Sequence, residues 1–175
     1  MKIIMFGLTG LGSIVLESFI KKGFKILAVS TRKEIKEYPH FKCKNITEIC
    51  NENKIPVYFD KTYFDKLSAE LIVSATYHKK IELTKCTYQD GFNIHPSMLP
   101  HLKGRDPIKK ALELNINKLG VSVHKLTDKF DIGQIIFQKP LYFTSSDTKK
   151  TLVNKLKPLY RKAADIIIEK YTVKL

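Results

Sequence analysis

KIIMFG (Lys2 to Gly7) and, after a glycine-rich turn, SIVLESFIK (Ser13 to Lys21) are the two stretches that decide the fold. The first is a short apolar run that stops at a glycine, and the second has apolar residues at helical spacing. Together they predict a strand, a turn and a helix. A strand joined to a helix in this way is the repeating unit of α/β proteins.

The same alternation of strand-like and helix-like segments continues along the chain. Short apolar runs predict strands at Phe24 to Ser30, Pro56 to Phe59, Leu71 to Ala75 and Phe92 to His95. Helices are predicted at Ile46 to Asn53 and Ile108 to Leu114, and the charged segment Thr31 to Phe41 is interpreted as a loop. Strands separated by helices pair in parallel through right-handed crossovers, so the pattern predicts an open α/β sheet.

The last third of the chain departs from this alternation. After Gly120, VSVHKL and IIFQKPLYF are strand-like runs joined by a polar loop, and they are expected to pair as a hairpin-like edge. A final amphipathic helix is expected at about 147–171, kinked or split by Pro158. Its expected core face consists of Leu152, Val153, Leu156, Leu159, Ala163, Ile166 and Ile167. No repeat or linker divides the sequence, so residues 1–175 are expected to form a single domain.

The charge balance is strongly basic. Lys and Arg number 31 against 17 Asp and Glu, which gives a formal charge of +14. Such an excess points first to a nucleic acid, a membrane surface or a phosphorylated ligand. The arginines are Arg32, Arg105 and Arg161 alone, however, and base and phosphate recognition favours the planar guanidinium. A lysine-rich solvated surface is therefore the simpler interpretation.

Cysteine, histidine and apolar patterns argue against several other classes. The three cysteines, Cys43, Cys50 and Cys86, are odd in number and never spaced as CxxC, so neither a disulfide framework nor a zinc knuckle is indicated. The five histidines contain no HExxH or other compact ligand spacing, which leaves a metal site unsupported. No stretch approaches the roughly 20 apolar residues that cross a bilayer, so a cytoplasmic location is expected.

The glycine turn after the first predicted strand lies where doubly wound folds bind phosphate. Gly7, Gly10 and Gly12 are spaced as GxxGxG, however, whereas the dinucleotide fingerprint is GxGxxG. Arg32 and Lys33, after the second predicted strand, would suit the 2′-phosphate of NADP, which keeps an NADP-dependent reductase as an alternative. A turn that merely joins a strand to a helix is the other interpretation.

Asn93-Ile-His95 holds the most informative polar residues. Residues two apart on a strand project to the same side, so both side chains are expected to point into one site. An amide N–H can stabilise an oxyanion, and an imidazole can donate a proton to a leaving nitrogen. In structural terms, Asn93 can instead cap a turn and His95 can be a satisfied core residue. Downstream, Asp131 either closes a turn before Gly133 or orients the histidine and stabilises its charged form.

Two longer blocks of sequence are more specific than these single residues. They are NIHPSMLPHLKGRDPI, from Asn93 to Ile108, and GVSVHKLTDKFDIGQIIFQKPL, from Gly120 to Leu141, with a weaker likeness in LIVSATYHKKI and KIIMFG. In this order they resemble the folate-dependent formyltransferases, the family of the glycinamide ribonucleotide, methionyl-tRNA and amino-sugar formyltransferases. The resemblance covers nearly the whole chain. It implies a Rossmann-like fold, an open and mostly parallel sheet with helices on both faces.

The resemblance also implies an activity and its residues. Members of the family pass the formyl group of N10-formyltetrahydrofolate directly to a primary amine, with no covalent enzyme intermediate. By motif position, Asn93, His95 and Asp131 form the catalytic trio. The residues implied at the folate site are His78, Lys79, Lys80, Ile81, Leu126, Asp128 and Phe130. Those implied at the acceptor site are Ser97, Met98, Gly104 and Pro107.

The acceptor amine is less constrained. Gly104-x-x-Pro107-Ile108 has the form typical of the amino-sugar and tRNA branches, so a nucleotide-linked amino sugar is the first expectation. Glycinamide ribonucleotide is the alternative, because of that branch's single-domain size and the glycine-serine turn at 9–13. A methionyl-tRNA formyltransferase core is a further alternative, but that branch resembles a two-domain protein, so nucleic acid is not an expected partner. No membrane partner is expected, and a homodimer is left open.

Overall fold

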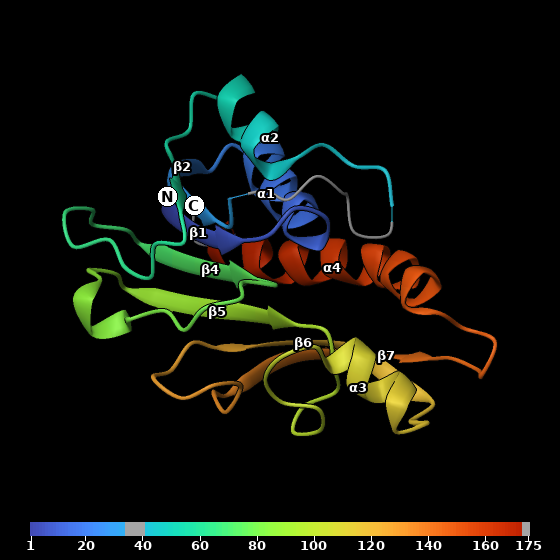
Figure 1. Ribbon diagram of the computed structural model, residues 1–175. Coiled ribbons are helices and arrows are strands. Elements are labelled where there is room, and N and C mark those ends of the chain that lie inside the picture. Colours follow the sequence, from blue (N-terminus) through green and yellow to red (C-terminus); the bar gives the residue numbers. More distant parts are fainter. Residues whose placement is uncertain (34–40, 173–175) are drawn as a thin grey trace.

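The computed structural model describes residues 1–33 and 41–172. Within these residues a sheet of seven strands has the order β3-β2-β1-β4-β5-β6-β7 (Figure 1). The strands are β1 (Lys2–Gly7), β2 (Lys25–Thr31), β3 (Val57–Phe59), β4 (Leu71–Ala75), β5 (Asp90–His95), β6 (Lys118–Lys125) and β7 (Ile135–Tyr142). Strands β1 to β5 are parallel, and β6 and β7 form an antiparallel hairpin at one edge. The predicted α/β sheet and its hairpin are confirmed, whereas most of the predicted loop at 31–41 lies outside the described residues.

The glycine turn between β1 and helix α1 (Leu11–Lys21) is required by backbone geometry. Gly10 has a φ of 100°, a conformation that other residues rarely adopt, and its N–H donates to the Ser13 hydroxyl at 3.3 Å. A Cβ on Gly12 would lie 3.2 Å from the carbonyl oxygen of Ala75, so the glycine lets α1 pack closely against β4. Turn geometry and close packing therefore account for two of the three glycines of the GxxGxG spacing.

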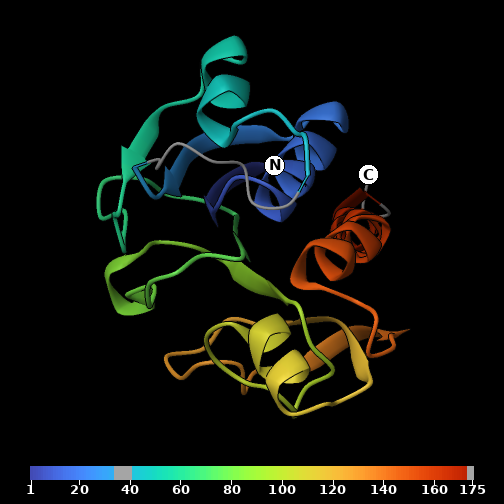
Figure 2. The same ribbon diagram turned by 45° about the vertical axis from the view of Figure 1, so that its right-hand side comes forward.

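Two hydrophobic clusters cover the two faces of the sheet. The larger combines strand residues with residues from all four described α-helices, namely α1, α2 (Ile46–Glu52), α3 (Pro107–Glu113) and α4 (Lys149–Thr172). Figure 2 shows α1 and α4 next to each other on one side of the sheet. The smaller cluster is covered by segments 60–69 and 81–88, which include the 3₁₀ turn η1 (Leu83–Lys85). Among the described residues, the α-helices thus contribute to the first cluster, and the turn η1 lies over the second.

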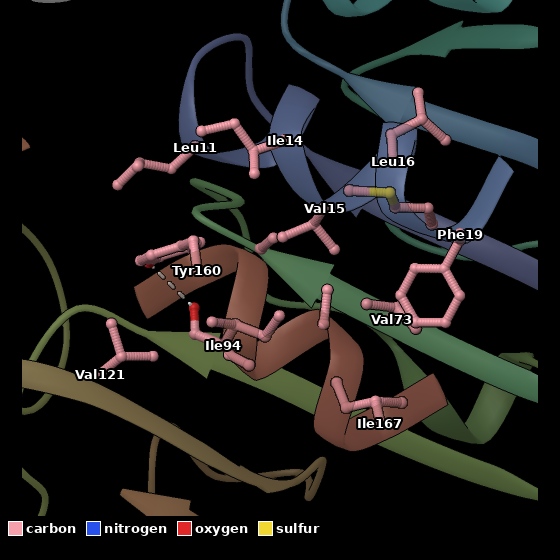
Figure 3. Packing of buried hydrophobic residues seen from close by; sticks show 14 of the residues in the cluster. Leu11, Ile14, Val15, Leu16, Phe19, Val73, Ile94, Val121, Tyr160 and Ile167 are labelled. Atoms are coloured by element: carbon pink, nitrogen blue, oxygen red, sulfur yellow. Dashed lines mark hydrogen bonds between the residues drawn. The ribbon is translucent and has the colours of Figure 1, made fainter. Parts of the chain in front are cut away.

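Helix α4 supplies much of the larger cluster and continues through Pro158, so the predicted split does not occur. Its buried residues are Leu152, Val153, Leu156, Tyr160, Ala163, Ala164, Ile167 and Ile168. Leu159 and Ile166, predicted to be in the core, flank this stripe and are half-buried. Tyr160 is fully buried, and its hydroxyl donates to the Ile94 carbonyl at 3.3 Å (Figure 3). Like the other described helices, α4 is not long and apolar enough to cross a membrane.

Candidate active site

Strand β5 separates core residues from polar residues by the alternation of its side chains. Phe92 and Ile94 belong to the larger hydrophobic cluster, so Asn93 and His95 project to the opposite face, away from the core to which the α-helices contribute. On the neighbouring strand β6, His124 is paired directly with Asn93. The predicted placement of Asn93 and His95 on one side of a strand is confirmed, and the antiparallel register adds His124 to that side.

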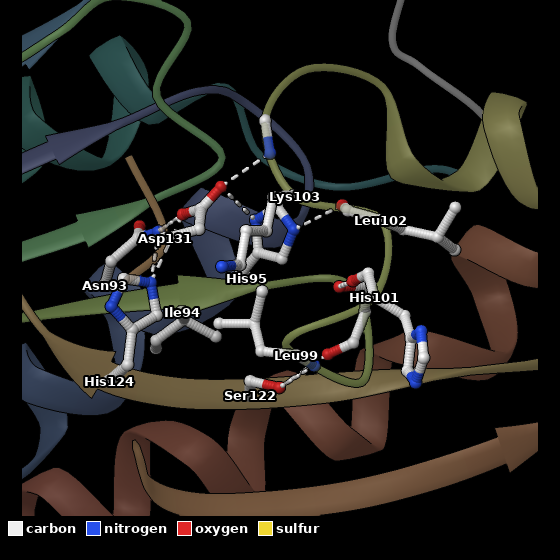
Figure 4. A network of polar contacts seen from close by, with 12 residues as sticks. Asn93, Ile94, His95, Leu99, His101, Leu102, Lys103, Ser122, His124 and Asp131 are labelled. Atoms are coloured by element: carbon white, nitrogen blue, oxygen red, sulfur yellow. Dashed lines mark hydrogen bonds and ion pairs between the residues drawn. The ribbon is translucent and has the colours of Figure 1, made fainter. Parts of the chain in front are cut away.

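The carboxylate of Asp131 joins these residues into one cluster (Figure 4). Its Oδ1 atom accepts a hydrogen bond from Asn93 Nδ2 at 3.1 Å and lies 3.3 Å from His124 Nε2. Its Oδ2 atom accepts a hydrogen bond from the Gly104 N–H at 2.7 Å and lies 3.5 Å from His95 Nδ1. The three residues implied by the motifs therefore lie together, around a carboxylate whose residue is only 6% exposed.

The loop between β6 and β7 carries Asp131 over this face, and a glycine two residues later makes its path possible. Asp131 has a φ of 53°, in the left-handed region that short polar side chains tolerate. A Cβ on Gly133 would lie 1.9 Å from the Lys125 carbonyl oxygen and 3.3 Å from His124 Nδ1. No other residue fits there without moving the loop. The Asp-x-Gly spacing is thus explained by the close return of the loop against the end of β6.

Both ring nitrogens of His95 face a partner. The Leu102 carbonyl oxygen lies 3.0 Å from Nε2, and because a carbonyl can only accept, Nε2 carries a proton. Nδ1 is therefore the atom that gains or loses a proton, and it faces Asp131. Burial lowers the pKa of His95, and this effect outweighs the nearby carboxylate and the Leu102 carbonyl, which raise it. The ring is accordingly neutral at pH 7 and able to accept a proton at Nδ1.

The charge of Asp131 is maintained by its neighbours. Burial alone raises the pKa of this carboxyl, but the contacts with His124, with His95 and with the Gly104 N–H lower it by more. The net pKa lies below the usual value for an aspartate, so the group is ionised at neutral pH. An ionised carboxylate beside the neutral His95 ring favours the uptake of a proton by that ring.

The side-chain amide of Asn93 already has hydrogen-bond partners within the cluster. Its Nδ2 atom is 3.1 Å from Asp131 Oδ1 and 3.1 Å from His124 Nε2. His124 Nδ1 lies 2.8 Å from the Lys125 carbonyl and donates to it, whereas Nε2 lies near both Asn93 Nδ2 and Asp131 Oδ1. A ligand oxygen that takes a hydrogen bond from Asn93 must therefore displace one of these partners. In the described residues, no group of three or more His, Cys, Asp or Glu is placed to hold a metal ion.

The segment after β4, implied at the folate site, is linked to the cluster. His78 Nε2 lies 2.8 Å from Asp60 Oδ1, and Lys79 Nζ lies 3.6 Å from the same oxygen. The Arg105 guanidinium donates to the His78 carbonyl at 3.5 Å. Because Arg105 follows Gly104, this bond connects the segment to the backbone that binds Asp131.

The remaining residues implied at the folate site differ in exposure. Lys80, Asp128 and Phe130 are exposed. Leu126 is half-buried and packs against the smaller hydrophobic cluster. Ile81 is a buried member of that cluster, so the structure places its side chain in the core and leaves only its backbone for a ligand.

Most of the residues implied at the acceptor site are buried or bonded to neighbouring parts of the chain. Ser97 is fully buried and its hydroxyl donates to the His101 carbonyl at 2.8 Å. Pro107 is buried at the first position of α3, and Met98 is half-buried. The N–H of Gly104 donates to the Asp131 carboxylate. The side chains of Ser97 and Pro107 are therefore enclosed, and the acceptor site implied at these four residues stays a prediction.

Three members of the cluster are not among the residues implied as the catalytic trio. His124 enters through the pairing of β6 with β5, and the signal for it was the hairpin-like edge next to the Asn93 strand. Leu102 and Gly104 enter through backbone groups, a carbonyl and an N–H. Every residue type offers a carbonyl, so residue type gives no signal for Leu102. Gly104 is implied by its motif at the acceptor site rather than beside Asp131, and its φ of 79° favours a glycine.

Comparison with solved structures shows which proteins share this fold. An N-formyltransferase from Helicobacter canadensis, solved with folinic acid and dTDP-3-aminofucose, covers 97% of this chain and 63% of its own, with a TM-score of 0.81 and 21% identity. Phosphoribosylglycinamide formyltransferase from Bacillus halodurans covers 95% of both chains, with a TM-score of 0.73 and 21% identity. The chain thus has the α/β fold of these formyltransferases.

Comparison of sequences then identifies the family. The family model described as formyl transferase matches residues 25–165. The bifunctional polymyxin resistance protein ArnA of Wigglesworthia glossinidia brevipalpis is 31% identical over 89% of this chain and 25% of its own length. Methionyl-tRNA formyltransferase of Pseudothermotoga lettingae is 30% identical over 89% of this chain and 54% of its own length. The chain belongs to the formyl transferase family, as its two sequence blocks indicate, and spans a quarter to about half of these relatives.

Proposed function

We propose that this protein transfers the formyl group of N10-formyltetrahydrofolate directly to a primary amine, through a tetrahedral intermediate. The observation that carries the proposal is the cluster of Asn93, His95 and Asp131 around one buried carboxylate, in a chain of this family. It combines a hydrogen-bond donor, a neutral imidazole and an ionised carboxylate. These are the groups that acyl transfer between two nitrogens requires.

The first step forms a bond between the amine nitrogen and the formyl carbon, and the formyl oxygen becomes an oxyanion. The Asn93 amide is the group proposed to donate to this oxygen, after giving up one of its two present partners. A preorganised donor of this kind is worth about 10²–10³ in rate. The cluster can supply this donor because Asn93 lies on a rigid strand, paired on both sides.

The second step moves one proton and breaks the old bond. The attacking amine loses a proton to the pair of His95 and Asp131. When the bond between the formyl carbon and N10 of the folate breaks, N10 receives one proton, so no net proton is gained or lost. His95 Nδ1 is suited to this role, because the neighbouring carboxylate stabilises the ring when it is charged. Tetrahydrofolate and the formylated amine are the products.

The proposed donor site lies between the segments 78–81 and 126–130. Arg105 supports this placement, because it connects His78 to the backbone next to Gly104 and so brings the first segment to the cluster. Exposed Phe130, one residue before Asp131, offers an apolar surface to a flat ring. Lys79 and Lys80 are placed to attract the anionic tail of the folate.

A nucleotide-linked amino sugar is the acceptor that we propose first. The Gly104-x-x-Pro107-Ile108 pattern supports it, as does the fold shared with the N-formyltransferase that was solved with dTDP-3-aminofucose. Glycinamide ribonucleotide is the second candidate, favoured by a fold shared over 95% of the Bacillus halodurans enzyme. Methionyl-tRNA is the third, favoured by the match to the Pseudothermotoga lettingae protein.

An assay with a panel of amines tests both the proposed formyl transfer and the proposed acceptor. The protein is supplied with N10-formyltetrahydrofolate and, separately, with 3-amino and 4-amino sugar nucleotides, glycinamide ribonucleotide and methionyl-tRNA. Release of tetrahydrofolate with an amino-sugar nucleotide is the expected result. Release with another member only would correct the acceptor, and release with none would refute the proposed function.

A further inference from the structure

The loop of residues 96–102 governs two contacts of the cluster. It leaves β5 directly after His95 and returns so that the Leu102 carbonyl meets His95 Nε2 at 3.0 Å. Two residues further along the chain, the Gly104 N–H binds Asp131. The path of the 96–102 loop therefore sets the orientation of the His95 ring and one hydrogen bond of the carboxylate.

Two side chains hold the backbone of this loop. Ser122 on β6 lies directly opposite His95, and Gln138 on β7 lies directly opposite Ser122, so the three form a row across the sheet. The Ser122 hydroxyl donates to the Ser97 carbonyl at 2.6 Å and accepts from the Leu99 N–H at 3.1 Å (Figure 4). Gln138 Nε2 donates to the Leu99 carbonyl and to the Ser122 hydroxyl, both at 2.8 Å.

These hydrogen bonds hold the 96–102 loop in place and do not join strands of the sheet to one another through their backbones. Ser122 is fully buried, and the proton and both lone pairs of its hydroxyl are engaged. Apart from the bond between the two side chains, each bond ends on the loop backbone. The loop also fits closely over β6, since a Cβ on Gly120 would lie 2.8 Å from Met98 Sδ. The sheet itself needs none of these polar contacts, because an apolar pair would fill the same row.

We propose that Ser122 and Gln138 are positioning residues of this site. They hold the 96–102 loop so that the Leu102 carbonyl keeps the proton of neutral His95 on Nε2 and leaves Nδ1 as the proton acceptor facing Asp131. Without this support the proton can move to Nδ1, where the carboxylate would accept it in a hydrogen bond. A ring in that tautomer cannot take a proton at Nδ1. The kinetic consequence rests on the proposed formyl transfer, whereas the effect on the ring does not.

Kinetics of two variants test the proposal. Gln138→Leu keeps the side-chain volume and removes both of its bonds, and Ser122→Ala removes the hydroxyl. Each is expected to lower kcat at least about tenfold and to change KM less than about twofold, because a small displacement of a reacting group costs rate rather than binding. Ser30→Ala is the matched control: Ser30 is fully buried, and its hydroxyl donates to the Lys61 carbonyl at 2.7 Å. It is expected to lower Tm comparably and to leave kcat unchanged.

Nitrogen NMR of the His95 ring gives a readout that a loss of stability alone would not move. In the unaltered protein above pH 7, the proton is expected on Nε2. In Gln138→Leu and Ser122→Ala, the ring signals are expected to shift toward the other tautomer, and in Ser30→Ala they stay in place. Unchanged ring signals in Gln138→Leu, or a kcat equal to that of the control, would overturn the proposal.

Two further outcomes keep the test decisive. If Ser122→Ala does not fold, Gln138→Leu decides alone, because Gln138 is only half-buried and tolerates an apolar replacement. If the unaltered protein formylates no amine, the proposed function fails, but the ring signals still show whether the pair fixes the tautomer of His95.

Discussion

The two faces of strand β5 perform different tasks, although they alternate within six residues. Phe92 and Ile94 are fully buried in the larger hydrophobic cluster. Asn93 and His95 face polar partners instead, from β6, from the loop that follows it and from the 96–102 loop. A side-chain period of two lets one strand carry the core on one side and the chemistry on the other. Substitutions at the even-numbered positions 92 and 94 should therefore mainly lower stability, and substitutions at the odd-numbered positions 93 and 95 should mainly lower activity.

The two faces of the sheet are also covered by different kinds of structure. All four described α-helices contribute to the cluster on the core face, whereas loops supply the partners on the polar face. The backbone groups of a helix interior are occupied by the helix itself. A loop can instead direct a carbonyl at His95 and an N–H at Asp131. Loops over a rigid sheet thus supply groups that a covering helix would not.

The largest effect is expected from a charge change on the polar face. Asp131→Asn keeps the shape of the side chain and removes the charge that supports proton uptake by His95. We expect kcat to fall about 10²–10⁴-fold, the usual contribution of acid–base catalysis. Initial rates of tetrahydrofolate release measure the loss, and circular dichroism checks that the variant is folded. A folded variant with nearly unaltered kcat would refute the assigned role.

Neighbouring positions on β5 give the sharpest contrast between the faces. Phe92→Ala is expected to lower the free energy of unfolding by about 3–5 kcal/mol, because it leaves a cavity in the core, with little change of kcat in the folded protein. Asn93→Ala is expected to lower kcat about 10²–10³-fold with a smaller loss of stability. Urea unfolding and rates at low temperature measure the two effects. Equal losses of kcat in both variants would contradict the separation of the faces.

A pair of glycine variants tests the path of the Asp131 loop. Gly133→Ala forces this loop away from the Lys125 carbonyl, so we expect a fall in kcat of at least about tenfold through displacement of Asp131. Gly23→Ala is the control: Gly23 has a φ of 77° and open space around it, so the variant should lose only about 1–2 kcal/mol of stability. If both variants keep full kcat, the close return of the loop has no part in catalysis.

The smallest effect is expected in the pH dependence of stability. Burial lowers the pKa of His95 in the folded protein, so the unfolded chain binds more protons as the pH falls through about 6.5. This part of the unfolding free energy is present above that pH and is lost below it. We expect the loss in urea unfolding between pH 7.5 and 5, and its reduction in His95→Gln. An identical pH dependence in the variant would show that His95 is not the group responsible.

Side-chain patterns made part of this site predictable. The two-residue period of a strand predicts that Asn93 and His95 share one side, whereas the resemblance to the formyltransferase motifs implies Asp131 as their partner. His124 requires one step more, the register of β6 on β5, which the hairpin order alone leaves open. Ile81 shows the reverse, because a motif position implied at a ligand site proves to be a core residue.

Other parts carry no signal in residue type. The carbonyl of Leu102 is available on any residue, and only the path of the chain gives it a role. Gly104 is marked as a glycine by its motif, but the bond from its N–H to Asp131 also depends on the path of the chain. Tyr160 is not among the predicted core residues of α4, and its hydroxyl needs a partner when it is buried. In the structure that hydroxyl is satisfied by the Ile94 carbonyl, which allows the ring to be fully buried.

The most direct test of the central claim is a comparison of the unaltered protein with His95→Ala. Both are supplied with N10-formyltetrahydrofolate labelled in the formyl carbon and with the amine found in the panel assay, and formation of the labelled N-formyl product is followed. We expect steady product formation by the unaltered protein and a rate at least about 10²-fold lower in the folded variant. Equal rates in the two proteins would contradict the claim.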